Sequence, residues 1–444
     1  MQTSHENYTR AKINANFEEV ERLLFLHSDN QIKPGLERIA KLLASVDNPQ
    51  NSFPAIHVVG TNGKGSTCAF LESIFRHSGY KTGFYSSPHL ESPGERLLIN
   101  SRELAAEKWL HALEILIAKL DNNSCDKTSY FELLTAAAFL LAQENNLDIG
   151  IIEAGLGGRL DATNLLGRVS CSVIASISMD HTEYLGDTIE KIAREKFAVI
   201  RENNCAVFAG NDESLTKLFR EICREKNSQG LVLGSEAEIS NVKITPNGNI
   251  FDFESENLHL QNIHTNLIGA YQVYNAALAL LAISSLRKSF PKINAQTILA
   301  GMKNAFWKGR FEIISHDPIT ILDGAHNPDG VAKLTESVKE LFSGEKVGLV
   351  YAAMRDKDYE SCLRTLNSIP NSSIYPTCVP NMKRSLESEN LAKCARKFHW
   401  ENSQSLENFD EPIHAARKSQ SENRVTIICG SLYLIGMIRK YFQA

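Results

Sequence analysis

The sequence predicts an α/β protein with a mainly parallel N-terminal sheet domain of the P-loop type and a smaller α/β C-terminal domain. Short apolar segments alternate with helical patterns along most of the chain, as in parallel strands joined by crossover helices. The first such segment leads through a glycine-rich loop into a helix. The 444 residues also exceed the size at which one hydrophobic core usually stops growing, so two domains are expected.

In the N-terminal part, short apolar runs indicate buried strands and more widely spaced apolar residues indicate helices. Strands are expected at 55–59, 82–85, 148–153 and 170–178, and helices are expected to end at Gly79 and to span 131–145 and 188–201. In an open parallel sheet, ligands gather beyond the carboxyl ends of the strands. The polar residues that follow these strands are therefore the candidates for chemistry.

A polar, irregular stretch is expected at 234–260, where Asn247-Gly248 is a hairpin signal. The alternation of strands and helices then restarts. Strands are expected at 319–323, 346–351 and 424–429, with a helix at 329–342 and another at the C-terminus. We place the boundary near Gly309, which gives domains of residues 1–309 and 310–444.

The composition narrows the class of protein. The formal net charge of −5 argues against a large nucleic-acid surface, which needs a concentrated basic face. No apolar stretch reaches the roughly 20 residues that cross a bilayer, and the first residues lack the apolar core of a secretory signal. The nine cysteines are scattered singly, as expected of thiols in a reducing compartment. We expect a monomeric, cytoplasmic protein without nucleic-acid or membrane partners.

The stretch from Gly60 to Ser66 reads GTNGKGS and has the features of a phosphate-binding loop. A glycine-rich turn that opens a helix directs backbone N–H groups and the positive helix end toward an anion. Lys64 adds a charge for the β and γ phosphates of a nucleotide, and Ser66 adds a hydroxyl for Mg²⁺. The common pattern is GxxxxGK[ST], from which Gly65 is a departure. Alone, the loop fits a kinase, GTPase, motor or ligase, or an ordinary strand-to-helix turn.

Seven further motifs follow the loop in a fixed order. They are Tyr85–His89 (YSSPH), Glu153–Asn164 (EAGLGGRLDATN), Ser178–Thr182 (SMDHT), Arg194–Lys196 (REK), Gly309–Glu312 (GRFE), Asp323–Pro328 (DGAHNP) and Cys429–Ser431 (CGS). Together with the loop, this set resembles the folylpolyglutamate synthase and dihydrofolate synthase family, which belongs to the Mur ligase group. The resemblance extends over both expected domains.

This resemblance implies a ligase whose substrates are ATP, L-glutamate and a pterin acid, either dihydropteroate or a folate. ATP would phosphorylate the carboxylate of the acid, because a carboxylate is a poor electrophile until one oxygen becomes a leaving group. The charge on the transferring phosphoryl must be met by cations and oriented dipoles. We favour a bifunctional enzyme that makes dihydrofolate and extends folates. Folylpolyglutamate synthesis alone is the nearest alternative, and a nucleotide switch without ligase activity is a distant one.

By resemblance, Ser87, Glu153 and His181 hold Mg²⁺ together with Ser66 of the phosphate loop, and two ions are expected. Mg²⁺ prefers oxygen, so the imidazole ligand depends on the resemblance. His181 is expected at the end of a strand. Taken singly, Ser87 could shape a turn, Glu153 could cap the next segment and His181 could be a structural polar residue at that strand end.

Lys196 lies beside apolar residues on an expected helix. By resemblance, it matches a lysine that is carbamylated in many family members. Addition of CO₂ turns the cation into an anionic oxygen ligand or hydrogen-bond partner near the second Mg²⁺. Partial burial would favour the neutral amine that this reaction needs. The alternative is a lysine that extends along the helix surface and keeps its charge in water.

The remaining nucleotide contacts are also taken from the resemblance. The expected ATP-binding residues are Asn62, Gly63, Lys64, Gly65, Ser66, Asn275, Arg310 and Asp323. If one ATP contacts both domains, closure would bring glutamate toward the acyl phosphate and exclude water. Alternatively, Arg310 forms a salt bridge between the domains, and the Asp323–Pro328 motif is a helix-capping turn.

Catalytic roles are expected for Lys64, Lys196 and His326. Either Asp323 or His326 could help to deprotonate the incoming amine, and no general base is assigned.

Contacts to the pterin acid are expected from two segments. By resemblance, Ile32, Lys33 and Pro34 belong to the first, although Lys33-Pro34 replaces the aspartate and leucine often found there. Otherwise this segment is a glycine turn before an amphipathic helix. The second is the glycine-rich loop, which contributes Gly157, Gly158, Arg159 and Asp161. Its composition suits close approach to a ligand, or an ordinary long turn. Lys383 and Arg384 are basic residues without an assigned role.

Overall fold

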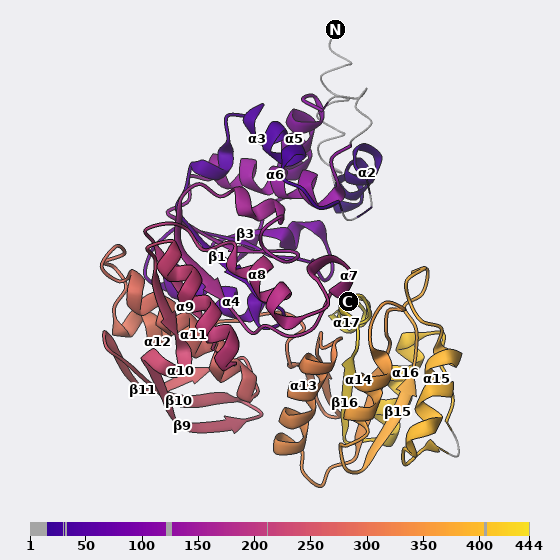
Figure 1. Ribbon diagram of the computed structural model, residues 1–444. Helices are drawn as coiled ribbons and strands as arrows, with labels where there is room; N and C mark the ends of the chain where they lie inside the picture. Colours follow the sequence, from indigo (N-terminus) through magenta and orange to yellow (C-terminus); the bar gives the residue numbers. More distant parts are fainter. Residues whose placement is uncertain are drawn as a thin grey trace. The chain divides into compact units, whose positions relative to one another are not determined.

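The computed structural model describes residues 16–29, 31, 33–120, 127–210, 212–403 and 406–443 (Figure 1). The chain forms two compact units. The first runs to Glu238 and also contains residues 253–260 and 275–304. The second contains residues 239–252, 261–274 and 305–444.

An eight-stranded sheet forms the centre of the first unit. In the order β4-β3-β2-β5-β1-β6-β7-β8, its strands are Arg102–Glu103, Leu97–Ile99, Thr82–Tyr85, Ile149–Glu153, Ala55–Val59, Val169–Ile174, Cys205–Phe208 and Gln229–Val232. The six neighbouring strands β2, β5, β1, β6, β7 and β8 are parallel. At one edge, β3 pairs antiparallel with β2, and β4 pairs antiparallel with β3. All five residues of β1 are buried, as a central strand of a sheet covered on both faces requires.

Helices pack on this sheet and on the segments that flank it. They are α2 (Phe17–His27), α3 (Glu37–Ala44), η1 (Pro49–Asn51), α4 (Lys64–His77), η2 (Pro93–Arg96), α5 (Ala106–Ile117), α6 (Tyr130–Glu144), η3 (Ala162–Leu165), α7 (Thr182–Leu185), α8 (Ile189–Phe197), α9 (Glu213–Glu225), α10 (Leu233–Glu236) and α12 (Ala295–Asn304). Figure 1 shows α2, α3, α5 and α6 gathered together, and they share a core around Trp109. A capping box of Ser129 and Glu132 sets the start of α6.

A separate three-stranded sheet has the order β11-β10-β9, and α11 (Ala270–Leu286) follows it. Its strands are β9 (Ala237–Thr245), β10 (Gly248–Ser255) and β11 (Leu258–Thr265). The hairpin turn expected at Asn247 is confirmed, but the expectation of irregular structure at 234–260 is wrong. In β11, Leu258, Leu260 and Ile263 are buried between exposed polar residues. This alternation of buried and exposed residues is typical of a strand. The prediction missed it because residues 234–260 are polar on average.

The second unit contains a five-stranded sheet in the order β12-β13-β16-β14-β15. These strands are Glu312–His316, Ile319–Leu322, Val425–Cys429, Val347–Tyr351 and Ser372–Pro376. The helices are α13 (Pro328–Leu341), α14 (Tyr359–Leu366), α15 (Ser388–Ala395), η4 (Arg396–Phe398), α16 (Pro412–Glu422) and α17 (Leu432–Gln443). Four strands are parallel, and β12 is an antiparallel edge. The three strands expected in this part are confirmed to within one residue.

The strand expected at 170–178 ends early, at Ile174. The residues after it turn toward the phosphate loop. Thr61 N–H donates to Ser176 O over 2.7 Å, and Ser178 N–H donates to Thr61 Oγ1 over 3.1 Å. These bonds replace the ladder that a longer strand would need. Within the described ranges, no helix is long and apolar enough to cross a membrane.

Candidate active site

The phosphate loop joins the end of β1 to the first turn of α4. Gly63 is the N-cap of α4 and has φ 88°, in the left-handed region that favours glycine. A Cβ at Gly63 would also collide with Asn275 Oδ1 from α11. The structure therefore brings two of the predicted nucleotide-binding residues together. Gly65 and Ser66 are buried in the first helical turn, where unpaired backbone N–H groups favour an anion.

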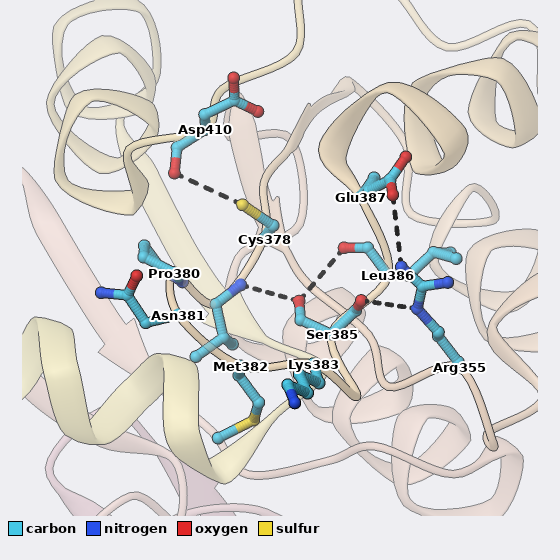
Figure 2. A pocket seen from close by; sticks show the side chains of 11 residues that line it. Arg355, Cys378, Pro380, Asn381, Met382, Lys383, Ser385, Leu386, Glu387 and Asp410 are labelled. Carbon is cyan, nitrogen blue, oxygen red and sulfur yellow. Dashed lines mark hydrogen bonds and ion pairs between the residues drawn. The ribbon is translucent and has the colours of Figure 1, made fainter.

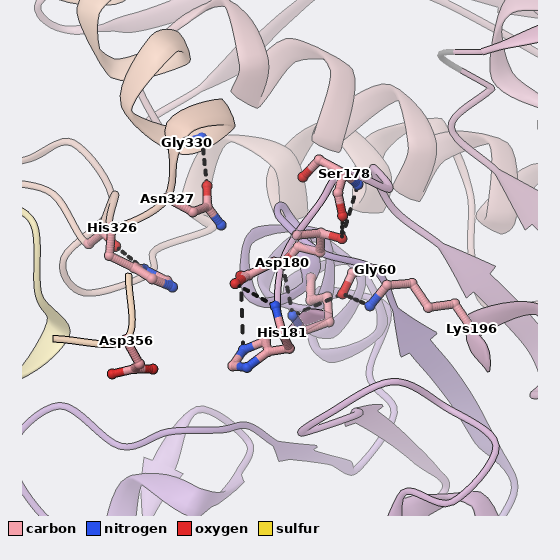
Figure 3. Close-up of polar contacts among 12 residues, drawn as sticks. Gly60, Ser178, Asp180, His181, Lys196, His326, Asn327, Gly330 and Asp356 are labelled. Atoms are coloured by element: carbon pink, nitrogen blue, oxygen red, sulfur yellow. Dashed lines mark hydrogen bonds and ion pairs between the residues drawn. The ribbon is translucent and has the colours of Figure 1, made fainter. Parts of the chain in front are cut away.

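Two lysine side chains meet at one carbonyl of this loop. Lys64 Nζ donates to Gly60 O over 3.2 Å and to Thr61 O over 3.1 Å. Lys196 Nζ, from α8, donates to the same Gly60 O over 2.9 Å (Figure 3). Lys196 is buried, which contradicts the alternative of a side chain extended toward water. Burial, and secondly the charge of Lys64, lowers the pKa of Lys196 to about 7.

Two predicted metal ligands, Glu153 and Ser87, lie in contact. Glu153 ends β5, and Ser87 follows the neighbouring parallel strand β2. Ser87 N–H donates to Glu153 Oε2 over 3.4 Å. Because Val58 of β1 is the register partner of Glu153, this carboxylate lies at the same edge of the sheet as the phosphate loop.

His181 lies in a turn rather than at a strand end, and that part of the sequence interpretation is wrong. It has φ 49° and forms the N-cap of α7. Its N–H donates to Asp180 Oδ1 over 2.9 Å, and its Nε2 lies 3.9 Å from Asp180 Oδ2 (Figure 3). The hydrogen bonds between Ser178 and Thr61 tie this turn to the phosphate loop.

The donor chemistry fits Mg²⁺ bound together with nucleotide phosphates. Within the described ranges, no group of three or more His, Cys, Asp or Glu side chains is placed to hold a metal. The predicted ligands are instead one carboxylate, one imidazole and two hydroxyls. Mg²⁺ in phosphate-transfer sites is typically bound through one or two carboxylates, with phosphate oxygens and water completing its shell. Glu153, Ser87 and Ser66 match that arrangement better than an all-protein cage.

The glycine-rich loop after β5 packs against α8. A Cβ at Gly158 would lie 2.6 Å from Glu195 O, so glycine is required there. Arg159 N–H donates to Glu195 O over 2.8 Å, and Arg159 Nε lies 3.0 Å from Glu195 Oε1. Gly157 has φ 71°, again a glycine conformation. The loop is thus fastened to the residue that precedes Lys196.

Asp161 is turned into its own loop. Its buried carboxylate accepts hydrogen bonds from Leu156 N–H over 2.8 Å, Thr163 N–H over 3.0 Å and the Thr163 hydroxyl. Burial raises the pKa of Asp161, and these hydrogen bonds oppose the rise. The contacts show a loop-ordering role, while its assignment to substrate stays a prediction.

The segment expected to contact the pterin acid is held by ion pairs. Lys33 Nζ lies 3.0 Å from Asp29 Oδ2, and Arg38 donates to Lys33 O over 2.7 Å. Arg38 also pairs with the buried Glu132 of α6 over 3.2 Å. Pro34 is exposed. Ile32 lies outside the described residues. The amphipathic helix that was the alternative reading exists as α3, which starts at Glu37.

In the second unit, Asp323 is buried just after β13. Its carboxylate accepts from Phe311 N–H and Ala325 N–H, both over 2.8 Å, and from the Tyr271 hydroxyl over 3.2 Å. Burial raises its pKa, which the charge of Arg310 opposes. The Arg310 guanidinium occupies the space that a side chain at Gly324 would need. The structure thus places Arg310 and Asp323 in one neighbourhood.

The same turn carries His326 and caps α13. Asn327 Oδ1 accepts from Gly330 N–H over 2.8 Å, which confirms the helix-capping alternative for this motif (Figure 3). His326 Nδ1 lies 2.8 Å from Gly324 O. Because a carbonyl can only accept, Nδ1 must carry a proton, and in the neutral ring Nε2 is then the basic nitrogen.

A cavity of about 380 Å³ lies in the second unit, beyond the carboxyl ends of β14 and β15 (Figure 2). Arg355, Met382, Lys383, Glu387 and Asp410 are among the residues that line it. Arg355 pairs with Glu387 over 3.3 Å. Lys383 is exposed and has no ion pair within the described part of the chain.

Sequence reasoning missed several residues of these networks. Tyr271 donates to Asp323, and Thr163 links His57 to Asp161; none of these three residues was given a role from the sequence. A polar histidine in the otherwise apolar strand AIHVV was a usable signal for His57. Tyr271 carried no local signal, since its partner is 52 residues away in the sequence.

The comparisons with known proteins match this arrangement. Residues 58–283 match the Mur ligase middle domain, and residues 309–432 match the Mur ligase, glutamate ligase domain. The dihydrofolate synthase/folylpolyglutamate synthase of Bacillus subtilis is 34% identical over 415 residues, which cover 92% of this chain and 95% of the relative. The chain belongs to the dihydrofolate synthase/folylpolyglutamate synthase family of Mur ligases.

Solved structures of this family have the same fold. The folylpolyglutamate synthase of Mycobacterium tuberculosis, complexed with ADP and AMPPCP, superposes with a TM-score of 0.88 at 28% identity, covering 96% of this chain and 98% of the other. Escherichia coli FolC in complex with DHPP and ADP gives 0.84 at 29% identity, with 96% and 97% covered. The Mur ligase fold expected from the sequence is confirmed.

Proposed function

We propose that this Mur ligase is bifunctional: it joins L-glutamate to dihydropteroate and adds further glutamates to folates, with ATP converted to ADP and phosphate. The observation that carries the proposal is the meeting of Lys64 and Lys196 at Gly60 O, at the sheet edge where Glu153 and Ser87 are in contact. The names of the Bacillus subtilis relative and the ligands of the Escherichia coli relative support the choice of substrates.

The phosphate loop would hold ATP and stabilise charge on the transferred phosphoryl. Backbone N–H groups at the start of α4, with Lys64, supply positive potential there. Ser66, Glu153 and Ser87, with His181 as a further candidate, would hold Mg²⁺, which screens phosphate charge when bound. A carboxylate oxygen of the pterin acid attacks the γ phosphorus, the bond to the ADP oxygen breaks, and an acyl phosphate results.

The amine of glutamate then attacks the acyl carbon, phosphate leaves, and the nitrogen loses a proton. His326 suits proton removal better than Asp323. The Asp323 carboxylate is buried and accepts three hydrogen bonds, whereas His326 is half-buried and, with its proton on Nδ1, has Nε2 as its basic nitrogen. We assign His326 as the candidate base and Asp323 to the order of the turn and to contact with ATP.

The proposal includes a monomeric protein that acts in the cytoplasm with Mg²⁺ and without nucleic-acid or membrane partners. The eight cysteines in the described part of the chain are free thiols, which supports a reducing compartment.

A product assay tests the reaction and separates its alternatives. The protein is incubated with ATP, Mg²⁺ and glutamate, and with either dihydropteroate or tetrahydrofolate, and the products are identified by mass spectrometry. We expect a glutamyl amide and ADP with both acids. Product from tetrahydrofolate alone would favour the folylpolyglutamate synthase alternative. AMP, or no glutamyl amide with either acid, would contradict the ligase proposal.

We further propose that the cavity beside Lys383 admits L-glutamate, because it lies at the carboxyl edge of the second sheet and is lined by a cation without an ion pair. Lys383→Ala is expected to raise the KM for glutamate by about tenfold, the effect of losing one charge-assisted hydrogen bond, and to leave the KM for ATP unchanged. The matched control is Lys393→Ala, since Lys393 is paired with Glu389 on the surface of α15. Equal glutamate KM values in the two variants would exclude this cavity as the entry site.

A further inference from the structure

A buried histidine lies in the strand that leads to the phosphate loop. His57 is the middle residue of β1 and has no exposed surface. Its Nε2 lies 2.8 Å from Thr163 Oγ1, in η3 at the end of the glycine-rich loop. The reaction steps assigned above do not use this residue.

The direction of the hydrogen bonds follows from the donors available. The Thr163 hydroxyl donates its proton to Asp161 Oδ1, so toward His57 it can only accept. His57 must therefore carry its ring proton on Nε2. Burial, with a smaller contribution from the charge of Arg201, lowers the pKa of His57 to about 3. The His57 imidazole is thus a neutral hydrogen-bond donor at physiological pH.

The bonds continue from Asp161 to the helix that carries Lys196. Asp161 closes the loop by accepting from Leu156 N–H, and inside this closed loop Gly158 lies against Glu195 O. Arg159 N–H donates to the same Glu195 carbonyl. The position of the loop therefore sets the position of α8 at residues 195 and 196.

The contacts return to the strand from which they started. Lys196 Nζ donates to Gly60 O, three residues beyond His57. The chain of contacts is a ring: from β1 to the loop through His57, from the loop to α8 through Gly158, and from α8 back to the end of β1 through Lys196. All of its members are in the first unit.

We propose that His57 is a positioning residue for the catalytic lysine: its Nε2–H, acting through Thr163 and Asp161, holds the glycine-rich loop on α8 and so fixes the Lys196 amine at Gly60 O. The inference rests on the proposed function only in the catalytic role of Lys196. The groups whose charges act on this amine are Lys64, Asp180 and Asp161.

The test compares Thr163→Val, which removes the hydroxyl at nearly equal size, with Thr163→Ser, which keeps it. His57→Leu breaks the ring from the other side. The reactivity of Lys196 toward trace acetic anhydride is followed across pH by peptide mass spectrometry, without nucleotide or bicarbonate. This readout needs no ligase activity, so failure of the proposed function would leave it intact.

We expect Thr163→Val and His57→Leu to raise the pH midpoint of Lys196 acetylation by about one unit or more, because the loosened amine gains solvent. In the ligase assay, kcat should fall about tenfold or more while the KM for ATP stays within about twofold. This pattern means that transition-state stabilisation is lost and that ATP binding is not. Thr163→Ser, which keeps the hydroxyl, should match the parent in both the Lys196 midpoint and kcat. Thr82→Val, a matched change that removes the buried hydroxyl bond from β2 to Glu72, should change neither.

An unchanged Lys196 midpoint in folded Thr163→Val would overturn the inference, even if kcat falls, because the effect would not pass through the lysine. If both ring variants fail to fold, Gly158→Ala provides the decision. Its added methyl meets Glu195 O and strains the ring at the helix. It should shift the same midpoint in the same direction, and no shift there would contradict the proposal.

Discussion

Lys64→Ala is expected to lower kcat by about two to three orders of magnitude, the usual cost of removing one group aimed at developing charge in a transition state. Lys64 is the cation of the phosphate loop itself, and its ammonium already lies within hydrogen-bond distance of two loop carbonyls. Rapid-quench measurement of acyl phosphate formation would show whether the loss occurs in the first chemical step.

The control for this variant is Lys119→Ala, which removes an exposed lysine just beyond α5. Circular dichroism and thermal unfolding should be the same for the two variants and the parent. Normal turnover by a correctly folded Lys64→Ala protein would remove the loop from the mechanism.

Lys196→Ala should also cause a large loss of activity. The reason differs from that for Lys64, because the contribution of Lys196 depends on the protonation state of its amine. With its pKa lowered to about 7, the buried amine is largely neutral above that pH, whereas an ordinary lysine becomes largely neutral only above about pH 10.5. Carbamylation needs the neutral amine, so in the parent both the carbamate and the activity should increase as the pH passes through 7 with bicarbonate present. ¹³C NMR with labelled bicarbonate would report a carbamate signal that Lys196→Ala lacks.

The same pKa shift predicts how stability depends on pH. The folded-state pKa lies below the unfolded value, so the cost of burying the charged amine is fully present below about pH 7 and decreases as the pH rises toward 10. Lys196→Ala should be more stable than the parent at acidic pH and lose that advantage in alkali. Suppose that Lys196→Ala keeps the parent's activity and carbamate signal, and that the stabilities of the two proteins do not cross with pH. Lys196 would then be an ordinary buried side chain.

Local patterns predicted the parts of the fold that depend on local interactions. The strand at 55–59 and the strand at 82–85 are confirmed to the residue, since buried apolar runs bounded by glycine and polar residues leave little freedom in their limits. The strand that ends at Ile174 was overestimated because its continuation is decided by hydrogen bonds to Thr61, more than 100 residues earlier.

The site divides in the same way. The sequence context of Lys64, Glu153, Ser87 and Lys196 marked them as candidates, and the structure places them near one another, while their roles stay predictions. Their partners were missed where the contact is long-range. The sequence near Asp161 does not indicate that Thr163 links Asp161 to His57, because this contact forms only when β1 and the loop lie side by side.

If the loop binds nucleotide and Lys196 takes up carbon dioxide, the Gly60 carbonyl shared by Lys64 and Lys196 would make these two ligands thermodynamically linked. Carbamylation would convert the neutral amine of Lys196 into a negatively charged group, within reach of the same phosphates. Whatever this exchange does to the affinity for nucleotide, bound nucleotide must do to the affinity for carbon dioxide, because the coupling free energy is reciprocal. If Lys196 is modified, the supply of dissolved inorganic carbon becomes an effector of the enzyme's affinity for ATP.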